Sequence, residues 1–313
     1  MKTILLLGGY GFLGANIMRY IEECKKGSFR VVVFDKYLHH PAGLTFNCVS
    51  KSYAGDFSDD VLIDRIFAEN AIDIVIHAIS TTVPTSSFNA RYDIQSNLIP
   101  TINLLHCMVQ HGVSDIVYLS SGGAVYGNTG VEKHMEDENV FPVSSYGVVK
   151  LAIEKYLMQY AELYGIRPLI VRISNPYGPL HYSMKQGICN VAMATALSGE
   201  TFNVWGDGSA GKDYIYVRDF TEILFLLLEK KIHTEVINVG SGQIATVREI
   251  LEQIKVLVPD FQWVYSEASK YDVSHFALDI SKLLSVIGDY KFTDLNEGLK
   301  KTFAWQMSVN NPH

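Results

Sequence analysis

The chain has 313 residues, of which 48% are hydrophobic and 19% are charged. This composition excludes an intrinsically disordered chain, and it supplies enough apolar residues for one large α/β domain or two closely packed ones. The net charge is −7 and the sequence has no basic tract, so we do not expect a nucleic-acid partner.

The apolar and cysteine patterns indicate where the protein works. The longest apolar stretch, residues 220–228, contains Glu222 and is too short to cross a bilayer, so we expect no membrane partner. The four cysteines form no CxxC pair, which predicts reduced thiols, a cytoplasmic enzyme and no metal site. The apolar start is similar to a secretion signal, but the glycines after it favour a strand, a turn and a helix.

Strand and helix patterns alternate along the first half of the chain. Buried-strand patterns occur at Thr3–Leu7, Arg30–Phe34, Ile72–His77, Asp115–Ser120 and Pro168–Ile173. Helical periodicity occupies Val61–Glu69, Leu98–His111 and Tyr146–Leu163. This alternation predicts an α/β fold with a doubly wound parallel sheet and helices on both faces.

The alternation weakens after Asn175. A helix is expected at Ile188–Leu197, strands and a turn within residues 202–217, and one more buried strand within residues 235–242. Residues 246–257 and 296–306 have the pattern of amphipathic helices. We therefore expect a smaller C-terminal lobe that packs against the first part.

The segment GGYGFLG follows the first predicted strand and precedes a helix, as a dinucleotide-binding loop does. Gly8 permits a tight turn, Gly11 lets the backbone approach a pyrophosphate, and Gly14 lets the helix pack on the strand. The N-terminus of the helix then faces the phosphates. The alternative is a plain turn between a strand and a helix.

An acidic residue closes the second predicted strand. Asp35 lies about 20 residues after the glycine loop, where a carboxylate accepts hydrogen bonds from the adenosine ribose, and this favours NAD over NADP. Lys36 follows it and would weaken that preference. Asp56, with Phe57 beside it, is a candidate partner for the adenine amino group, with an ordinary turn as the alternative.

Tyr146 and Lys150 form a Tyr-x-x-x-Lys motif, which places both side chains on one face of a helix. A cation beside a phenol stabilises the phenolate and lowers the pKa of the phenol from about 10 toward neutrality. Such a phenol is suited to accept the proton of a sugar hydroxyl. The alternative is an amphipathic helix with a surface lysine.

These segments occur in a characteristic order: GGYGFLG, Asp35, SSGGAVYG, YGVVK, RISNPYGP, KDYIYVRD and INVGSG. The series resembles the extended short-chain dehydrogenases/reductases, and is most similar to nucleotide-sugar epimerases/dehydratases of the UDP-galactose 4-epimerase type. The resemblance covers nearly the whole chain. It implies a Rossmann domain that binds NAD, residues 1–173 plus about 213–240, and a nucleotide-sugar-binding lobe, about 174–212 plus 241–313.

The resemblance also implies roles for individual residues. Tyr146 would be the catalytic acid/base and Lys150 would bind the nicotinamide ribose. The further cofactor-binding residues that it implies are Phe12 and Leu13 at the pyrophosphate, His77, Ala78, Ile79 and Ser80 along the cofactor, Asn97, and Pro176 near the nicotinamide. The implied substrate-binding residues are Ser121, Tyr146, Asn175, Trp205 at the base and Lys212 at the diphosphate. Trp205 as a core aromatic and Lys212 as a solvated turn residue are the alternatives.

Two positions depart from the pattern of the family. Gly122 stands where the family usually has the catalytic Ser or Thr, so we expect Ser121 to supply that hydroxyl, with Ser120 as the second choice. Asp272 follows Ser269, where the family commonly has an Arg, and Lys270 lies between them. In addition, Gly123 and Ala124 occupy the positions at which related 4,6-dehydratases carry an Asp-Glu pair, which argues against dehydration.

The sequence thus predicts an NAD-dependent enzyme that epimerises C4 of a nucleotide-linked hexose through a 4-keto intermediate. An NAD(P)H-dependent reductase of a nucleotide-linked 4-keto-6-deoxy sugar is the first alternative, and a non-catalytic NAD-binding sensor is the second. The resemblance further implies a homodimer, built from helices such as Leu98–His111 and Tyr146–Leu163, and a place in polysaccharide biosynthesis.

Overall fold

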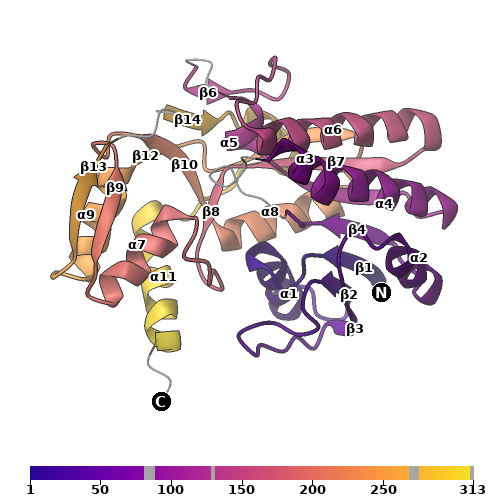
Figure 1. The fold of residues 1–313 in the computed structure, drawn as a ribbon, viewed down its shortest axis with the longest axis horizontal. Coiled ribbons are helices and arrows are strands. Elements are labelled where there is room, and N and C mark those ends of the chain that lie inside the picture. The colour runs from indigo at the N-terminus through magenta and orange to yellow at the C-terminus, as the bar shows by residue number, and fades with distance from the viewer. Residues whose placement is uncertain (81–88, 128–130, 268–274, 311–313) are drawn as a thin grey trace.

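A seven-stranded parallel sheet lies at the centre of the larger part of the fold (Figure 1). The computed structural model describes residues 1–80, 89–127, 131–267 and 275–310. The strands of this sheet are β1 (Lys2–Leu7), β2 (Phe29–Asp35), β3 (Val49–Ala54), β4 (Ile74–His77), β5 (Asp115–Ser121), β7 (Arg167–Ile173) and β11 (Glu235–Val239). Their order is β11-β7-β5-β4-β1-β2-β3, so the winding reverses between β1 and β4. In doubly wound sheets, ligands bind outside the carboxyl ends of the strands at such a switch point.

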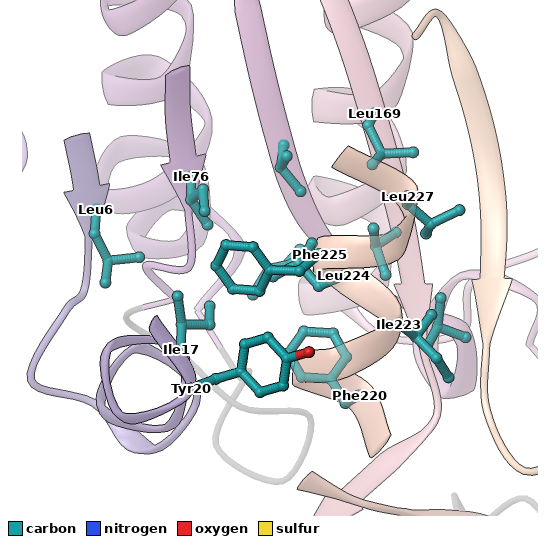
Figure 2. Close-up of a cluster of buried hydrophobic side chains, with 14 of the residues drawn as sticks. Leu6, Ile17, Tyr20, Ile76, Leu169, Phe220, Ile223, Leu224, Phe225 and Leu227 are labelled. Carbon is teal, nitrogen blue, oxygen red and sulfur yellow. The ribbon is translucent and has the colours of Figure 1, made fainter. Parts of the chain in front are cut away.

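Helices cover both faces of this sheet because the strand side chains alternate between two hydrophobic cores. In β1, Ile4 and Leu6 enter one core, and Leu5 and Leu7 enter the other. The first core is closed by α1 (Phe12–Cys24), α8 (Val217–Glu229) and α10 (Ser281–Ile287), and the second by α2 (Asp60–Glu69), α4 (Ile99–Gln110) and α6 (Ser145–Tyr164). Figure 2 shows Ile17 and Tyr20 of α1 and Phe220 of α8 packed below the strands. Full burial of each large apolar side chain contributes about 1.5–3 kcal/mol.

The two helices that carry most of the predicted site have identifiable boundaries. The Ser144 side chain caps α6 by accepting a hydrogen bond from the Gly147 N–H, and Gly165, with a φ of +71°, ends it. The helix expected over Leu98–His111 is confirmed as α4, which begins at Ile99. A short helix, α3 (Ala90–Asp93), and a π-helical turn, η2 (Ile94–Leu98), precede it and were not expected. Pro100 has no N–H to donate to the preceding turn, which favours this irregular geometry.

The C-terminal part contains two small sheets. Their strands are β6 (Lys133–His134), β8 (Asn175–Tyr177), β9 (Thr201–Trp205), β10 (Gly211–Tyr216), β12 (Ile244–Thr246), β13 (Gln262–Ser266) and β14 (His275–Leu278). The helices outside the large sheet are α5 (Gly122–Val125), α7 (Ile188–Leu197), α9 (Val247–Leu257) and α11 (Leu295–Asn310). The strand β10 pairs with β8, β12 and β14 of the small sheet, so the expected domain boundary at about residue 213 falls inside one strand.

Among the described residues, no helix combines the length and apolar character needed to cross a membrane.

Candidate functional site

The glycine loop lies at the carboxyl end of β1, beside the switch point of the sheet. Gly8 has a φ of +81°, which favours glycine, and a Cβ atom on Gly14 would lie 2.3 Å from the Gly8 carbonyl oxygen. Gly11 differs, because in the described part of the chain its Cβ would meet only the Gly8 oxygen, at 3.4 Å. The packing of the protein therefore requires Gly8 and Gly14, whereas Gly11 leaves open space at the N-terminus of α1. An uncapped helix N-terminus beside open space fits the pyrophosphate of a dinucleotide.

Asp35 lies next to this loop at the end of β2. Its Oδ2 atom accepts a hydrogen bond from the Tyr10 N–H at 2.9 Å, which holds the carboxylate beside the glycine turn. This position fits the predicted contact with an adenosine ribose, and Lys36 is exposed next to it.

Asp56 and Phe57 have local roles in the structure. The exposed Asp56 carboxylate accepts hydrogen bonds from the N–H and the hydroxyl of Ser58, and these bonds, with a smaller effect of Lys36, lower the pKa of Asp56. Phe57 is buried, and its ring centroid lies 5.1 Å from that of His77. The turn interpretation thus accounts for Asp56, and Phe57 is a core residue.

Phe12 and Leu13, which were predicted to lie at the pyrophosphate, pack against other residues of the protein. Leu13 is half-buried against the core that lies under α1, and Phe12 packs edge-to-face against His181, with ring centroids 4.7 Å apart. His181 is 7% exposed, and its Nδ1 atom has no hydrogen-bond partner in the described part of the chain. Sequence reasoning missed His181, because no motif marks it.

Tyr146 and Lys150 lie on one face of α6 and line one small cavity. Ser80 and Ser121 lie close enough to the Tyr146 phenol for their hydroxyls to lower its pKa by hydrogen bonding. The predicted catalytic tyrosine and serine therefore meet, although they are on different elements, and Ser80 joins them from the end of β4.

The expected effect of Lys150 on the phenol is wrong for the protein without a ligand. Burial raises the pKa of Tyr146 above its usual value, and the hydrogen bonds from Ser80 and Ser121 only partly oppose this. The Lys150 ammonium donates to the Leu119 carbonyl oxygen at 2.7 Å and lies 5.7 Å from the centroid of the Tyr146 ring. Burial lowers the pKa of Lys150 to about 8, against the opposing effect of Glu154. Desolvation is thus the largest effect on the pKa of both groups.

The structure distinguishes the two candidate serines. The Ser120 hydroxyl is buried and donates to Glu154 Oε1 at 2.5 Å, whereas Ser121 reaches Tyr146. Glu154 also forms a buried ion pair with Arg172, with 2.8 Å between Oε2 and Nη2. A Cβ atom on Gly122 would lie 2.8 Å from the end of the Leu278 side chain, so a hydroxyl residue at this position would displace that leucine. Glu154 was not predicted, although it continues the four-residue spacing of Tyr146 and Lys150.

The remaining predicted cofactor residues surround the same cavity. Residues that line it include His77, Ile79, Ser80 and Asn97, together with Thr101 and Tyr118, which sequence reasoning missed. The backbone of Ala78 lies 3.2 Å from the position of a Gly8 Cβ atom, so it faces the glycine loop.

The predicted substrate residues lie on the small sheets. Asn175, on β8, donates from Nδ2 to the Asp213 carbonyl oxygen at 2.8 Å, and Pro176 follows it on the same strand. Trp205 is 66% exposed, which excludes the core-aromatic alternative. Lys212 lies on β10 and is half-buried, which corrects the turn interpretation. Ser269, Lys270 and Asp272 lie outside the described residues.

One cluster of potential ligand atoms lies away from this site. Asp64, Cys107 and His111 bring an oxygen, a sulfur and a nitrogen atom within 4.8 Å of one another on α2 and α4. The His111 Nε2 atom is hydrogen-bonded to Asp64 Oδ1 at 2.8 Å, so a surface hydrogen bond accounts for the proximity of these two residues. The expectation that the protein holds no metal stays a prediction.

The fold and the glycine loop place the chain among the α/β dinucleotide-binding proteins. Residues 4–240 match the model of the NAD dependent epimerase/dehydratase family, so the chain belongs to that family and is an enzyme with NAD as its cofactor. It is 30% identical to a putative UDP-glucose 4-epimerase of Methanocaldococcus jannaschii over 98% of this chain and 99% of that protein. It is 26% identical to a dTDP-4-dehydro-6-deoxyglucose reductase of Escherichia coli over 95% of each. A solved UDP-glucose 4-epimerase of Thermotoga maritima with UDP-glucose superposes with a TM-score of 0.91 at 29% identity, covering 99% of this chain and 100% of that one.

Proposed function

We propose that this chain is an NAD-dependent nucleotide-sugar 4-epimerase. The observation that carries the proposal is the arrangement around Tyr146, whose phenol lies near the hydroxyls of Ser80 and Ser121 while Lys150 lines the same cavity. This arrangement lies beside the glycine loop, at the carboxyl ends of the strands where the family binds its cofactor.

Each group has a defined task in the proposed reaction. Tyr146 removes the proton of the sugar 4-hydroxyl and later returns it to the same oxygen. Ser121 donates a hydrogen bond to that oxygen as its charge changes, and Lys150 binds the nicotinamide ribose. NAD, held by the glycine loop and Lys150, would supply the acceptor and then the donor of the C4 hydride, so the overall reaction would be redox-neutral.

The nucleotide-sugar substrate follows from the same family membership. Asn175 and Lys212 are proposed to contact the sugar diphosphate, and the exposed Trp205 is proposed to stack on the base. Gly123 and Ala124 lie on α5, the short helix that begins directly after Ser121, and neither residue carries a carboxylate. Because elimination of water needs an additional acid and base, this segment favours epimerisation or reduction over dehydration.

The E. coli reductase supports a second candidate, reduction of a 4-keto-6-deoxy sugar on the same residues. Proton NMR of the purified protein with a panel of UDP- and dTDP-linked sugars, and no added cofactor, separates the two. An epimerase accumulates the C4 epimer to equilibrium over many turnovers. A protein that is silent until NADH is added, and then consumes a 4-keto sugar stoichiometrically, is the reductase and contradicts the epimerase proposal.

The Tyr146→Phe variant tests the third alternative, an NAD-binding sensor. We expect the variant to keep its bound NAD and its folding stability but to lose turnover by at least about 10²-fold, because the proton acceptor is absent. NAD released from the denatured protein is measured by absorbance, and turnover by NMR. A variant with unchanged turnover would show that Tyr146 is not the acid/base.

We further propose a homodimer that works in the cytoplasm on sugars for polysaccharide biosynthesis. Exposed apolar side chains on adjacent helices support the dimer: Ile99 on α4, and Val148, Tyr156 and Met158 on α6. Such a group of apolar side chains suits a contact with a second copy of the chain. All four cysteines are free thiols, which supports a reducing compartment.

A further inference from the structure

His77 and Thr101 form a buried chain of hydrogen bonds with the π-helical turn. The Thr101 hydroxyl lies 2.6 Å from the backbone carbonyl oxygen of Asn97 and 2.9 Å from His77 Nε2. His77 is 2% exposed and Thr101 is 1% exposed. Water therefore has little access to either bond, and each group depends on its protein partner.

The direction of each bond follows from the number of protons available. A carbonyl oxygen can only accept, so the single hydroxyl proton of Thr101 must go to the Asn97 carbonyl. The Thr101 oxygen then has only lone pairs left for His77, and the imidazole must donate from Nε2. His77 is thus a neutral imidazole with its proton on Nε2 and an acceptor at Nδ1.

The surroundings of His77 keep it neutral. Burial, with a smaller contribution from the Lys150 ammonium, lowers the pKa of His77 to about 3. The rings of Phe57 and Tyr118 pack against it with centroids 5.1 and 5.3 Å away, and no carboxylate acts on its pKa. The Nδ1 atom has no partner within the described ranges of the chain.

The hydrogen bonds from His77 through Thr101 end at an interruption in the helix. η2 leads into α4 just before Pro100, so the backbone around Asn97 does not have regular α-helical hydrogen bonding. Asn97 lines the same cavity as Tyr146 and Lys150. A hydrogen bond from residue 101 to the carbonyl of residue 97 supplies a side-chain partner at this interruption.

We propose that His77 is a positioning residue, which acts through Thr101 to hold the η2 turn and thereby sets Asn97 in the cofactor site. The assignment builds on the proposed function but needs only that NAD binds beside Asn97. Loss of the Thr101 hydroxyl removes the support of the turn and leaves the His77 N–H without an acceptor. A valine at this position keeps the shape of the side chain and removes only the hydrogen bonds.

The test compares three variants of the full chain. Thr101→Val should lower the affinity for NAD by about ten-fold, and Thr101→Ser should restore it, because one buried hydrogen bond is worth roughly this factor. Thr302→Val is the control, since Thr302 is equally buried and its hydroxyl makes the same kind of bond to the Gly298 carbonyl in α11, with no histidine attached. Bound NAD is measured by calorimetry on cofactor-stripped protein, and thermal unfolding is measured alongside.

The tautomer of His77 gives a second readout that is independent of turnover. Nitrogen NMR of ¹⁵N-histidine-labelled protein, assigned with His77→Gln, should show a neutral Nε2–H form throughout the pH range in which the protein stays folded. An Nδ1–H form, unchanged NAD affinity in Thr101→Val, or an equal loss in Thr302→Val would overturn the proposal. If the wild type binds NAD but epimerises no sugar, the proposed function fails while these results still decide the role of His77.

Discussion

Ser120 and Ser121 are neighbours in the chain, yet their hydroxyls have different partners because side chains alternate across β5. Ser120 donates to the Glu154–Arg172 ion pair, and Ser121 reaches Tyr146. The family pattern, with Gly122 at the usual hydroxyl position, ranked Ser121 first and Ser120 second without a structural reason. The direction of the strand at its last residue makes the choice.

This difference predicts opposite results for the two alanine variants. Ser121→Ala should lower turnover by about 10²-fold with little effect on stability, because a hydrogen bond to the reacting oxygen is lost. Ser120→Ala should instead destabilise the fold by about 1–3 kcal/mol, because a buried carboxylate loses a donor. Turnover by NMR and chemical denaturation measure the two effects. Equal loss of turnover in both variants would contradict the assignment.

Lys150 predicts a pH dependence of stability. Its folded-state pKa is about 8, below its ordinary value of 10.5, so between these pH values the unfolded chain binds more protons than the folded one. The contribution of Lys150 to stability should therefore rise as the pH increases from about 8 toward 10.5. The free energy of unfolding of cofactor-free wild type and Lys150→Met, measured by denaturation at several pH values, isolates the contribution of Lys150. Parallel curves for the two proteins would show that the lysine is not desolvated.

At the scale of elements, the β1–α1 unit carries the cofactor loop. Gly14 lets α1 pack against the backbone of Gly8 and Gly9, with a Cβ position 2.6 Å from the Gly9 Cα atom. Gly11 begins the helix and has space around it. The same residue type therefore serves the packing of the protein at one position and the approach of a ligand at the other.

Two substitutions separate these roles. Gly14→Ala should destabilise the protein by about 1–3 kcal/mol, because the added methyl group overlaps backbone atoms that cannot move aside. Gly11→Ala should leave stability within about 0.5 kcal/mol but weaken NAD binding, because the methyl group occupies the space for the pyrophosphate. Thermal unfolding and calorimetry with NAD measure the two quantities. Normal NAD affinity in Gly11→Ala would show that the phosphates lie elsewhere.

At the scale of the whole molecule, a buried carboxylate joins the large and small sheets. Asp213 on β10 accepts hydrogen bonds from the N–H groups of Ser241, Gly242 and Leu278 and from the Ser241 hydroxyl. Ser241 and Gly242 follow β11 of the large sheet, and Leu278 lies on β14 of the small sheet. Burial raises the pKa of Asp213, although the four hydrogen bonds oppose this. Asp213 is thus one of the side chains that link the two sheets.

The proposed dimer predicts different results for two exposed valines. Val148→Asp on α6 should produce monomers, because it places a charge in the apolar contact, whereas Val61→Asp on α2 should leave the dimer intact. Val61 is 81% exposed and Val148 is 52% exposed, so solvent accessibility alone does not account for the difference. Light scattering after size-exclusion chromatography measures the molar mass. A monomeric wild type would contradict the dimer.

Much of the fold could be predicted from sequence because its signals are local. The helix predicted over Tyr146–Leu163 is observed over Ser145–Tyr164, and the helix predicted at Ile188–Leu197 has those bounds. Strand ends were less accurate: the strand expected from Ile72 begins at Ile74. The π-helical turn before Pro100 was missed, because apolar periodicity does not reveal which backbone groups lack partners.

The sequence by itself determined the doubly wound fold, the glycine loop with Asp35, and the spacing of Tyr146 and Lys150. Each depends on residue order within one or two adjacent elements. Only the tertiary structure decided that Ser120 donates to Glu154, that burial raises the pKa of Tyr146, and that His77 meets Thr101. The reason is that hydrogen bonds and desolvation depend on distances between elements far apart in the chain, which periodicity and spacing do not encode.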